Sequence, residues 1–249
     1  MKSKATRKRL DVLLVERGIA ESIQKAQGMI LAGEVRVDGA RADKAGVAIA
    51  EDAHVEVASR SQKFASRGGV KLEGALEDFG LSVTGLVCLD VGASTGGFTD
   101  CLLQHGATKV FAVDVNVDQM DWKLQQDARV VRVERNAREL QRGDVGEEVG
   151  LVVADVSFIS VGKVLGPAAA VARDGAKFLI LVKPQFELRR EEVGSGGIVE
   201  EKELHDKAIA LVRTAAEAAG LECLGVKASR LAGAEGNQEY FLHARKRGQ

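Results

Sequence analysis

Residues Leu89–Thr99, with the sequence LDVGASTGGFT, decide the fold of this chain. They continue an apolar segment, Val87–Val91, and lead into a segment with helical spacing, Phe98–His105. Glycines at such a corner let the backbone approach a ligand closely, and the free N–H groups of the first helical turn favour an anionic group. The stretch therefore predicts a strand, a ligand-holding loop and a helix. The simpler interpretation is a glycine turn that only closes the corner.

An acidic residue further along the chain indicates which kinds of ligand the glycine loop could bind. Asp114 lies 22 residues beyond Gly92 and ends the next apolar segment. In dinucleotide-binding folds, the acidic residue at this place accepts hydrogen bonds from ribose hydroxyls. The dinucleotide fingerprint would need a glycine where Ser94 stands. The combination is compatible with either a nucleotide or an adenosyl ligand.

From about residue 67 onward, strand patterns alternate with helical ones. We expect strands at Val87–Val91, Lys109–Val115, Val130–Glu134, Leu151–Val156, Lys177–Val182, Glu222–Ala228 and Tyr240–Ala244. Helical stretches between them include Phe98–His105, Val161–Ala172 and Glu201–Ala219. Several strands are continuous apolar runs, which is typical of strands buried on both faces. The pattern predicts an α/β fold with a doubly wound, mostly parallel seven-stranded sheet. The last strand is expected to be antiparallel, because only a short loop precedes it.

The first 60 residues predict a separate, small α+β domain. One helix carries Leu10, Leu13 and Leu14 on its apolar side, and a second is capped by Ser22 and stopped at Gly33. Strand patterns follow at Val35–Val37 and His54–Val57, with a tight turn at Asp38–Gly39 after the first of them. We therefore expect a first domain over residues 1–60, a linker over residues 61–66 and a second domain over residues 67–249.

Composition excludes several classes of protein. Of the 249 residues, 45% are hydrophobic, which is enough to bury two cores without disulfides. Cys88, Cys101 and Cys223 lie far apart and the four histidines are scattered, so neither a disulfide framework nor a metal site is expected. We see no pattern of a signal peptide or of a membrane-spanning helix. These features predict a cytoplasmic protein that holds no metal.

Charge is distributed unevenly along the chain. Residues 1–71 hold 14 Lys and Arg against 9 Asp and Glu, whereas residues 72–249 hold 21 against 27. A basic first domain favours a polyanionic partner such as nucleic acid, although a solvated tail of five cations accounts for much of the excess.

Two residues of opposite charge end neighbouring strands of the predicted sheet. Asp155 lies at the end of the fourth strand and Lys183 directly follows the fifth. Ligands of open α/β sheets bind at the carboxyl ends of the strands. A lysine there is costly to bury unless a carboxylate compensates its charge, so we expect the two to pair; the alternative is a lysine that reaches solvent. Two further stretches, ASRGGVKL at 65–72 and GNQEYF at 236–241, could each be ordinary loops.

Taken together and in this order, the motifs resemble a known family along nearly the whole chain. Residues 9–44 resemble the alpha-L RNA-binding domain of a small-subunit ribosomal protein and of pseudouridine synthases. Residues 66–241 resemble the FtsJ-type 2′-O-ribose methyltransferase domain. The combination resembles the TlyA (hemolysin A-like) family of bacterial ribosomal RNA 2′-O-methyltransferases. The resemblance implies transfer of a methyl group from S-adenosyl-L-methionine to ribosomal RNA.

The resemblance also implies the site residues. It assigns a catalytic tetrad to Lys71, Asp155, Lys183 and Glu239, and all four positions match. It assigns the binding of S-adenosylmethionine to Asp90, Gly92, Ala93, Ser94, Thr95, Gly96, Gly97, Phe98, Thr99, Asp114 and Asn136, the last near the adenine. One departure is Ile23, which stands where the family usually has an arginine after the helix-capping serine. RNA contact through that helix is expected to be weaker.

The implied reaction sets the tasks of the tetrad. A ribose hydroxyl is a poor nucleophile at neutral pH, whereas a sulfonium methyl is already activated, so the tasks are alignment and management of the hydroxyl proton. We expect Lys183 to contact the 2′-hydroxyl and to deprotonate or orient it. Neighbouring Lys71 favours the neutral form of Lys183 and Asp155 opposes it, so which lysine acts as the base stays open. Glu239 is expected to orient Lys71.

Further residues are candidates for holding the RNA. We expect phosphate contacts from Arg7, Lys8, Arg9, Lys44 and Arg67, which position RNA without reading its sequence. The glycine-rich stretch Glu187–Gly197 follows Lys183 and is a candidate lid over the site; a solvated loop is the alternative.

Rival functions predict other features. A membrane-damaging hemolysin would need an amphipathic or spanning segment, and we find none. A noncatalytic RNA-binding ribosome assembly factor would have lost tetrad or glycine-loop positions, and an NAD-dependent oxidoreductase is disfavoured by Ser94. The chain stops soon after the last strand, without a further helix. By the resemblance, this favours the branch that acts on a cytidine of large-subunit RNA, and a monomer is expected.

Overall fold

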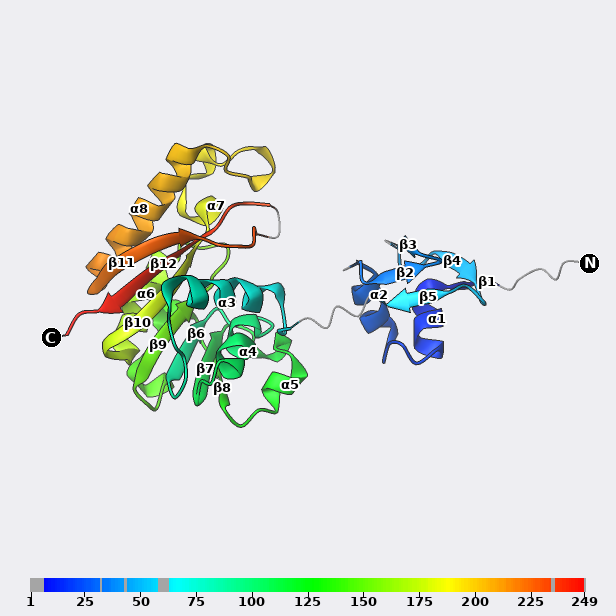
Figure 1. Cartoon of the computed structure of the whole chain (residues 1–249), viewed down its shortest axis with the longest axis horizontal. Helices are drawn as coiled ribbons and strands as arrows, with labels where there is room; N and C mark the ends of the chain where they lie inside the picture. The colour runs from blue at the N-terminus through cyan, green and yellow to red at the C-terminus, as the bar shows by residue number, and fades with distance from the viewer. Residues whose placement is uncertain (1–6, 32, 43, 58–62, 234–235, 249) are drawn as a thin grey trace, which may run out of the picture. The chain divides into compact units, whose positions relative to one another are not determined.

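The computed structural model describes residues 7–31, 33–42, 44–57, 63–233 and 236–248. It divides into two compact units, Met1–Gln62 and Lys63–Gln249, which are described separately (Figure 1).

The first unit packs two helices on two small sheets. Helices α1 (Leu10–Glu16) and α2 (Ile23–Leu31) share a core with strands from both sheets. Strand β1 (Arg7–Arg9) pairs with β4 (Ala48–Ala50), and β2 (Val35–Val37) lies between β3 (Ala40–Arg41) and β5 (Val55–Val57), all antiparallel. Strands β1, β3 and β4 are not among the sequence predictions, because their sequences RKR, AR and AIA lack the alternation of valine with a charged residue that β2 and β5 show.

Two local features that the sequence predicts for this unit, a helix cap and a tight turn, are present in the structure. Ser22 accepts a hydrogen bond at Oγ from the backbone N–H of Lys25 at 3.2 Å, so it caps α2. Asp38 and Gly39 both have positive φ, 49° and 81°, which is the conformation of a two-residue hairpin turn between β2 and β3. The predicted turn is confirmed.

A seven-stranded sheet organises the second unit. The order is β11-β12-β10-β9-β6-β7-β8. The strands are β6 (Val87–Val91), β7 (Lys109–Asp114), β8 (Val130–Glu134), β9 (Val149–Ala154), β10 (Ala172–Val182), β11 (Leu221–Ala228) and β12 (Tyr240–Lys246). Strands β8, β7, β6, β9 and β10 run parallel, and β12 is antiparallel to both β10 and β11. The predicted α/β sheet and its antiparallel last strand are confirmed.

Helices cover both faces of this sheet (Figure 1). The cluster on one face takes its helical residues from α3 (Arg67–Phe79), α4 (Gly97–Gln104) and α5 (Trp122–Gln125). The cluster on the other face takes them from α6 (Gly162–Val171) and α8 (Lys202–Ala218). Successive residues of a strand point to opposite faces, so Leu151 and Val153 join the first cluster and Val152 and Ala154 the second. Covering both faces explains the continuous apolar runs.

Short helices complete the second unit. The single-turn helix α7 (Pro184–Glu187) follows β10 directly. Five 3-10 turns lie at Val117–Gln119 (η1), Ala137–Glu139 (η2), Arg142–Asp144 (η3), Arg190–Glu192 (η4) and Ser195–Gly197 (η5).

The segment between the units differs from the linker predicted over residues 61–66. Residues 61 and 62 lie outside the described residues, and Lys63 already belongs to the second unit. Phe64 is only 1% exposed and packs in the core cluster under α3 and α4, because its ring gains more from burial than from solvent. Ser66 stands at the N-cap position of α3. The second unit thus begins before residue 67.

Within the described part of the chain, none of the helices combines the length and the apolar character that crossing a membrane requires.

Candidate active site

The glycine loop lies between β6 and α4 and depends on backbone conformations that larger residues avoid. Gly92 has φ 85°, and a Cβ there would overlap the carbonyl oxygen of Asp155. Gly96, the N-cap of α4, has φ 92°, and a Cβ there would overlap the side chain of Leu124. Ser94 also has positive φ, 48°. These conformations let the loop backbone form one wall of an open pocket, while the N–H groups of Gly92 and Ala93 donate to the carbonyl oxygen of Val113.

Asp90 lies beneath this loop and is completely buried. Its Oδ2 accepts a hydrogen bond from Thr99 Oγ1 at 2.7 Å, whereas no partner lies near Oδ1 among the described residues. Burial raises the pKa of Asp90 to about 7, and the hydrogen bond from Thr99 lowers it only in part. A buried carboxylate oxygen without a partner is suited to a cationic ligand group.

Asp114 ends β7 and stabilises the glycine loop by hydrogen bonding. Its Oδ2 accepts a hydrogen bond from the N–H of Ser94 at 2.9 Å, and its Oδ1 accepts from Asn116 N at 3.0 Å. Asn136, just beyond β8, accepts at Oδ1 from the backbone N–H of Arg138 at 3.1 Å and caps η2. Both residues follow strands at the same edge of the sheet as the glycine loop.

Strand register brings the four predicted catalytic residues to this edge. Ala154 of β9 pairs with Ile180 of β10, and Val182 of β10 pairs with Tyr240 of β12. Asp155 and Lys183 therefore follow neighbouring parallel strands, and Glu239 directly precedes the antiparallel strand beside them. Lys71 comes from α3, which packs against α4.

The four residues form two ion pairs. Lys183 Nζ lies 2.5 Å from Asp155 Oδ1, and the two side chains are 11% and 21% exposed. Lys71 Nζ donates to Glu239 Oε2 at 2.6 Å, with side chains 10% and 3% exposed. Each charge lies within reach of an opposite charge, which makes its burial tolerable. The expected pairing of Asp155 with Lys183 is present.

A pocket opens at the point where the strand order reverses, between β6 and β9. Its lining includes ten of the predicted site residues: Arg67, Lys71, Gly92, Ala93, Ser94, Thr95, Gly97, Phe98, Asp155 and Lys183. Six others lie outside the lining: Asp90, Gly96, Thr99, Asp114, Asn136 and Glu239. Ser66, Gly68 and Ser157 also line it. Sequence reasoning placed these three in motifs but gave them no role.

The stretch predicted as a lid is fastened at both ends. At the first end, Glu187 accepts hydrogen bonds from Ser160 Oγ at 2.6 Å and from Val161 N at 2.8 Å. Burial raises the pKa of Glu187. At the other end, Asn237 accepts from Val199 N at 2.9 Å and donates to Gly197 O at 2.8 Å. If this stretch opens as a lid, the movement is confined to the residues between these two sets of hydrogen bonds.

Phe158 is an exposed aromatic residue beside the ion pairs. It follows Ser157 with φ 67°, and it is 88% exposed. Its ring centroid lies 5.4 Å from that of Phe186, and the Phe186 centroid lies 5.9 Å from Lys183 Nζ. A strained, solvent-exposed ring has no role in the core, so it is available to a ligand.

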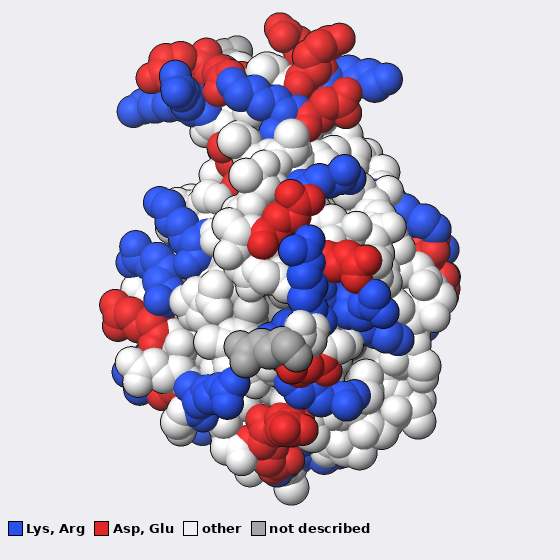
Figure 2. All heavy atoms as spheres, turned by 90° about the vertical axis from the view of Figure 1, so that its left-hand side faces the viewer, with Lys and Arg blue, Asp and Glu red and all other residues white. Residues whose placement is uncertain are grey.

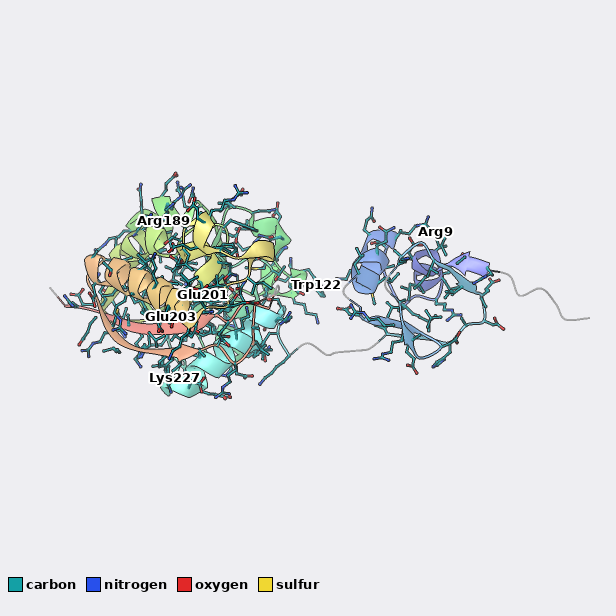
Figure 3. All side chains as sticks on the ribbon, turned by 90° about the horizontal axis from the view of Figure 1, so that it is seen from above. Arg9, Trp122, Arg189, Glu201, Glu203 and Lys227 are labelled. Atoms are coloured by element: carbon teal, nitrogen blue, oxygen red, sulfur yellow. The ribbon has the colours of Figure 1, made fainter. Side chains whose placement is uncertain are left out.

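The predicted phosphate-binding residues lie on both units. Lys8 pairs with Glu16 and Glu51 at 2.7 and 2.9 Å, and Arg9 pairs with buried Asp11 at 2.6 Å (Figure 3 labels Arg9). These acids neutralise much of the charge that the sequence assigned to phosphate. Arg7 donates to the carbonyl of Ala48.

The remaining two candidates carry exposed cations. Lys44 is exposed in the first unit, and Arg67 is exposed at the start of α3 in the second. Neither has an acidic partner among the described residues. On the face drawn in Figure 2, cations and acids are interspersed, so this face presents no broad basic field.

Comparisons with known proteins agree with this arrangement. The profile of FtsJ-like methyltransferases matches residues 64–246, and that of the S4 domain matches residues 8–55. The chain is 46% identical to the 16S/23S rRNA (cytidine-2'-O)-methyltransferase TlyA of Mycobacterium tuberculosis, over 97% of this chain and 91% of the relative. It is 41% identical to Hemolysin A of Brachyspira hyodysenteriae, over 94% and 98%. A solved structure described as "Putative hemolysin from Streptococcus thermophilus" matches with a TM-score of 0.76 and 38% identity, over 98% and 90%.

Proposed function

The chain belongs to the TlyA/hemolysin A-like family, which joins an S4 RNA-binding domain to an FtsJ-like methyltransferase domain, and from this premise we propose that it methylates ribosomal RNA on a ribose 2′-hydroxyl. The observation that carries the proposal is the meeting of two lysine–carboxylate pairs beside a glycine loop. The printed name of the M. tuberculosis relative specifies a cytidine of 16S and 23S RNA. We propose a cytidine of large-subunit RNA as the target here.

The pocket fits S-adenosylmethionine as the methyl donor. Gly92 and Gly96 leave room for a ligand against the backbone, and the unpartnered Oδ1 of Asp90 suits a positively charged group. Asp114 stands where ribose hydroxyls are bound in related folds. When bound, the donor supplies a methyl group on a positively charged sulfur, which leaves as a neutral thioether.

The four paired residues remove the hydroxyl proton and hold one another in position. Lys183 receives the proton of the 2′-hydroxyl as the oxygen forms its bond to the methyl carbon. Asp155 holds Lys183 in place at 2.5 Å, and Glu239 holds Lys71 at 2.6 Å. Lys71 lines the same pocket as Lys183 and presents a second cationic side chain to the ligand. Positioning and proton removal together account for the catalysis, since the methyl group needs no further activation.

The S4 domain supplies the second half of the function. Its exposed cations, such as Lys44, contact phosphates and hold the RNA, while the catalytic unit acts on the ribose. Because the substrate is ribosomal, the enzyme works in the cytoplasm, and we propose that it does so as a monomer. The noncatalytic assembly-factor alternative is not favoured, since all four tetrad residues are present and paired.

Methyl transfer from tritiated S-adenosylmethionine to purified ribosomal subunits tests the proposal. The wild-type chain should label large-subunit RNA. Lys183→Ala should lower the rate by at least about 100-fold, the usual contribution of a proton-transfer group. Lys202→Ala, which removes an exposed lysine from the start of α8, is the matched control and should keep full activity.

Donor binding must be measured alongside activity. Trp122 is the only tryptophan of the chain, and the N–H of its neighbour Asp121 donates to Thr95 O in the glycine loop at 3.1 Å. Its fluorescence should therefore report donor binding, which Lys183→Ala should leave intact. Absence of label on any ribosomal RNA, despite donor binding, would contradict the proposed function. Turnover of Lys183→Ala within tenfold of wild type would contradict the role of Lys183.

A further inference from the structure

Ser157 touches the catalytic pair without belonging to the tetrad. It lies in the loop after β9, two residues beyond Asp155, and it lines the same pocket as Lys71 and Lys183. Its Oγ accepts a hydrogen bond from Lys183 Nζ at 2.9 Å. The loop is held in place, since the N–H of Asp155 donates to Val91 O at 2.9 Å and Val156 is buried.

The importance of this contact follows from how few hydrogen-bond partners Lys183 has. A lysine ammonium has three N–H donors arranged tetrahedrally around nitrogen. Ser157 Oγ, at 2.9 Å, accepts one of these N–H bonds, whereas Asp155 Oδ1, 2.5 Å from Nζ, forms an ion pair without hydrogen-bond geometry. The Phe186 ring lies near Nζ, with its centroid 5.9 Å away. Among the described residues no other hydrogen-bond acceptor of Lys183 is present, so the amino group keeps bonding capacity for a ligand.

We propose that Ser157 is a positioning residue for methyl transfer. Its hydrogen bond fixes the rotation of the Lys183 amino group beside Asp155, so that the lone pair of the nitrogen can face the substrate 2′-hydroxyl whose proton it receives. With the ion pair to Asp155 as the only contact, no hydrogen bond would fix this rotation, and part of the population would be misaligned. This inference rests on the proposed methyltransferase function and adds to it a fifth residue, which acts through Lys183.

The test compares Ser157→Ala, Ser157→Thr and a control in the full-length chain. Ser82→Ala removes an exposed serine hydroxyl from the loop between α3 and β6 of the same unit and serves as the control. The measurements are kcat and KM for methyl transfer to ribosomal subunits, with donor affinity from Trp122 fluorescence.

For Ser157→Ala we expect kcat to fall about 10-fold, which corresponds to about 1.4 kcal/mol. Donor affinity should stay within twofold of wild type. Ser157→Thr retains the hydroxyl and should restore most of kcat, and Ser82→Ala should match wild type.

Two results would overturn the inference. One is a kcat that Ser157→Ala leaves unchanged. The other is a loss of kcat that Ser157→Thr does not restore, or one that comes with a parallel loss of donor affinity, since a merely structural role predicts that pattern. Both are distinguishable from failure of the proposed function, in which the wild-type chain itself transfers no methyl group to ribosomal RNA.

Discussion

At pH 4 the Asp90→Asn variant should be less stable than the wild-type chain, and at pH 8 it should be more stable. Asp90 is fully buried, and burial raises its pKa from 3.8 to about 7. Because the folded-state pKa lies above the unfolded one, the folded chain binds more protons in this window. Its stability should therefore fall as pH rises from about 4 to about 7 and then level off.

The magnitude follows from the two pKa values. A pKa difference of about 3 corresponds to a loss of about 4 kcal/mol above pH 7 in the absence of ligand. Asp90→Asn removes this charge but keeps an oxygen to accept from Thr99. Its amide N–H would replace the unpartnered Oδ1, at a cost of about 1–3 kcal/mol. The variant should be less stable than wild type at pH 4 and more stable, by about 1–3 kcal/mol, at pH 8.

Urea unfolding of the full-length chain measures these differences. Trp122, which projects from α5 of the catalytic unit and is 66% exposed (Figure 3), reports the unfolding of that unit. Asp206→Asn removes an exposed carboxylate from α8 and should leave the pH dependence of wild type unchanged. An equal loss of stability for Asp90→Asn at both pH values would refute the raised pKa.

The same variant tests how Asp90 meets the donor. We expect Asp90→Asn to weaken the binding of S-adenosylmethionine about tenfold at pH 8, because a neutral amide cannot compensate a cationic group as a carboxylate does. Unchanged affinity would show that Asp90 supports the loop only.

Two further predictions concern the walls of the site. Glu239→Ala should abolish methyl transfer and destabilise the catalytic unit by about 3–5 kcal/mol in urea unfolding, since it leaves the buried Lys71 ammonium without its partner. The double variant Lys71→Met/Glu239→Leu should recover most of the stability and none of the activity. A cost below about 1 kcal/mol for the single change would mean that the pair is solvated. Phe158→Ala should raise KM for the ribosomal subunit about tenfold by removing a stacking surface for a base, with donor affinity and stability unchanged. Equal KM for the two chains would remove Phe158 from the RNA contacts.

Several elements could be predicted from the sequence because their causes are local. Continuous apolar runs such as Val149–Ala154 reveal strands covered on both faces, and the positions of Gly92 and Gly96 reveal a loop that needs positive φ. The proximity of Asp155 and Lys183 also follows, because each ends a strand of one parallel sheet.

Other features could not be predicted because their causes lie far away in the sequence. Arg7–Arg9 looks like a basic tail until Ala48–Ala50 pairs with it as a strand. The same folding brings Glu16 and Glu51 to Lys8, which reduces the charge available for phosphate. Phe64 looks like the end of a linker until a core in the second unit covers it.

The difference between what the sequence determines and what the tertiary structure determines is clearest within the site itself. The sequence alone determined which residue types stand at the strand ends, since hydrophobic periodicity and glycine conformation act over a few neighbouring residues. Only the tertiary structure decided that Lys71 pairs with Glu239, 168 positions away, and that Ser157 accepts a hydrogen bond from Lys183. Such contacts depend on the register of β10 with β9 and β12, and register is set by the packing of whole strands rather than by any one residue.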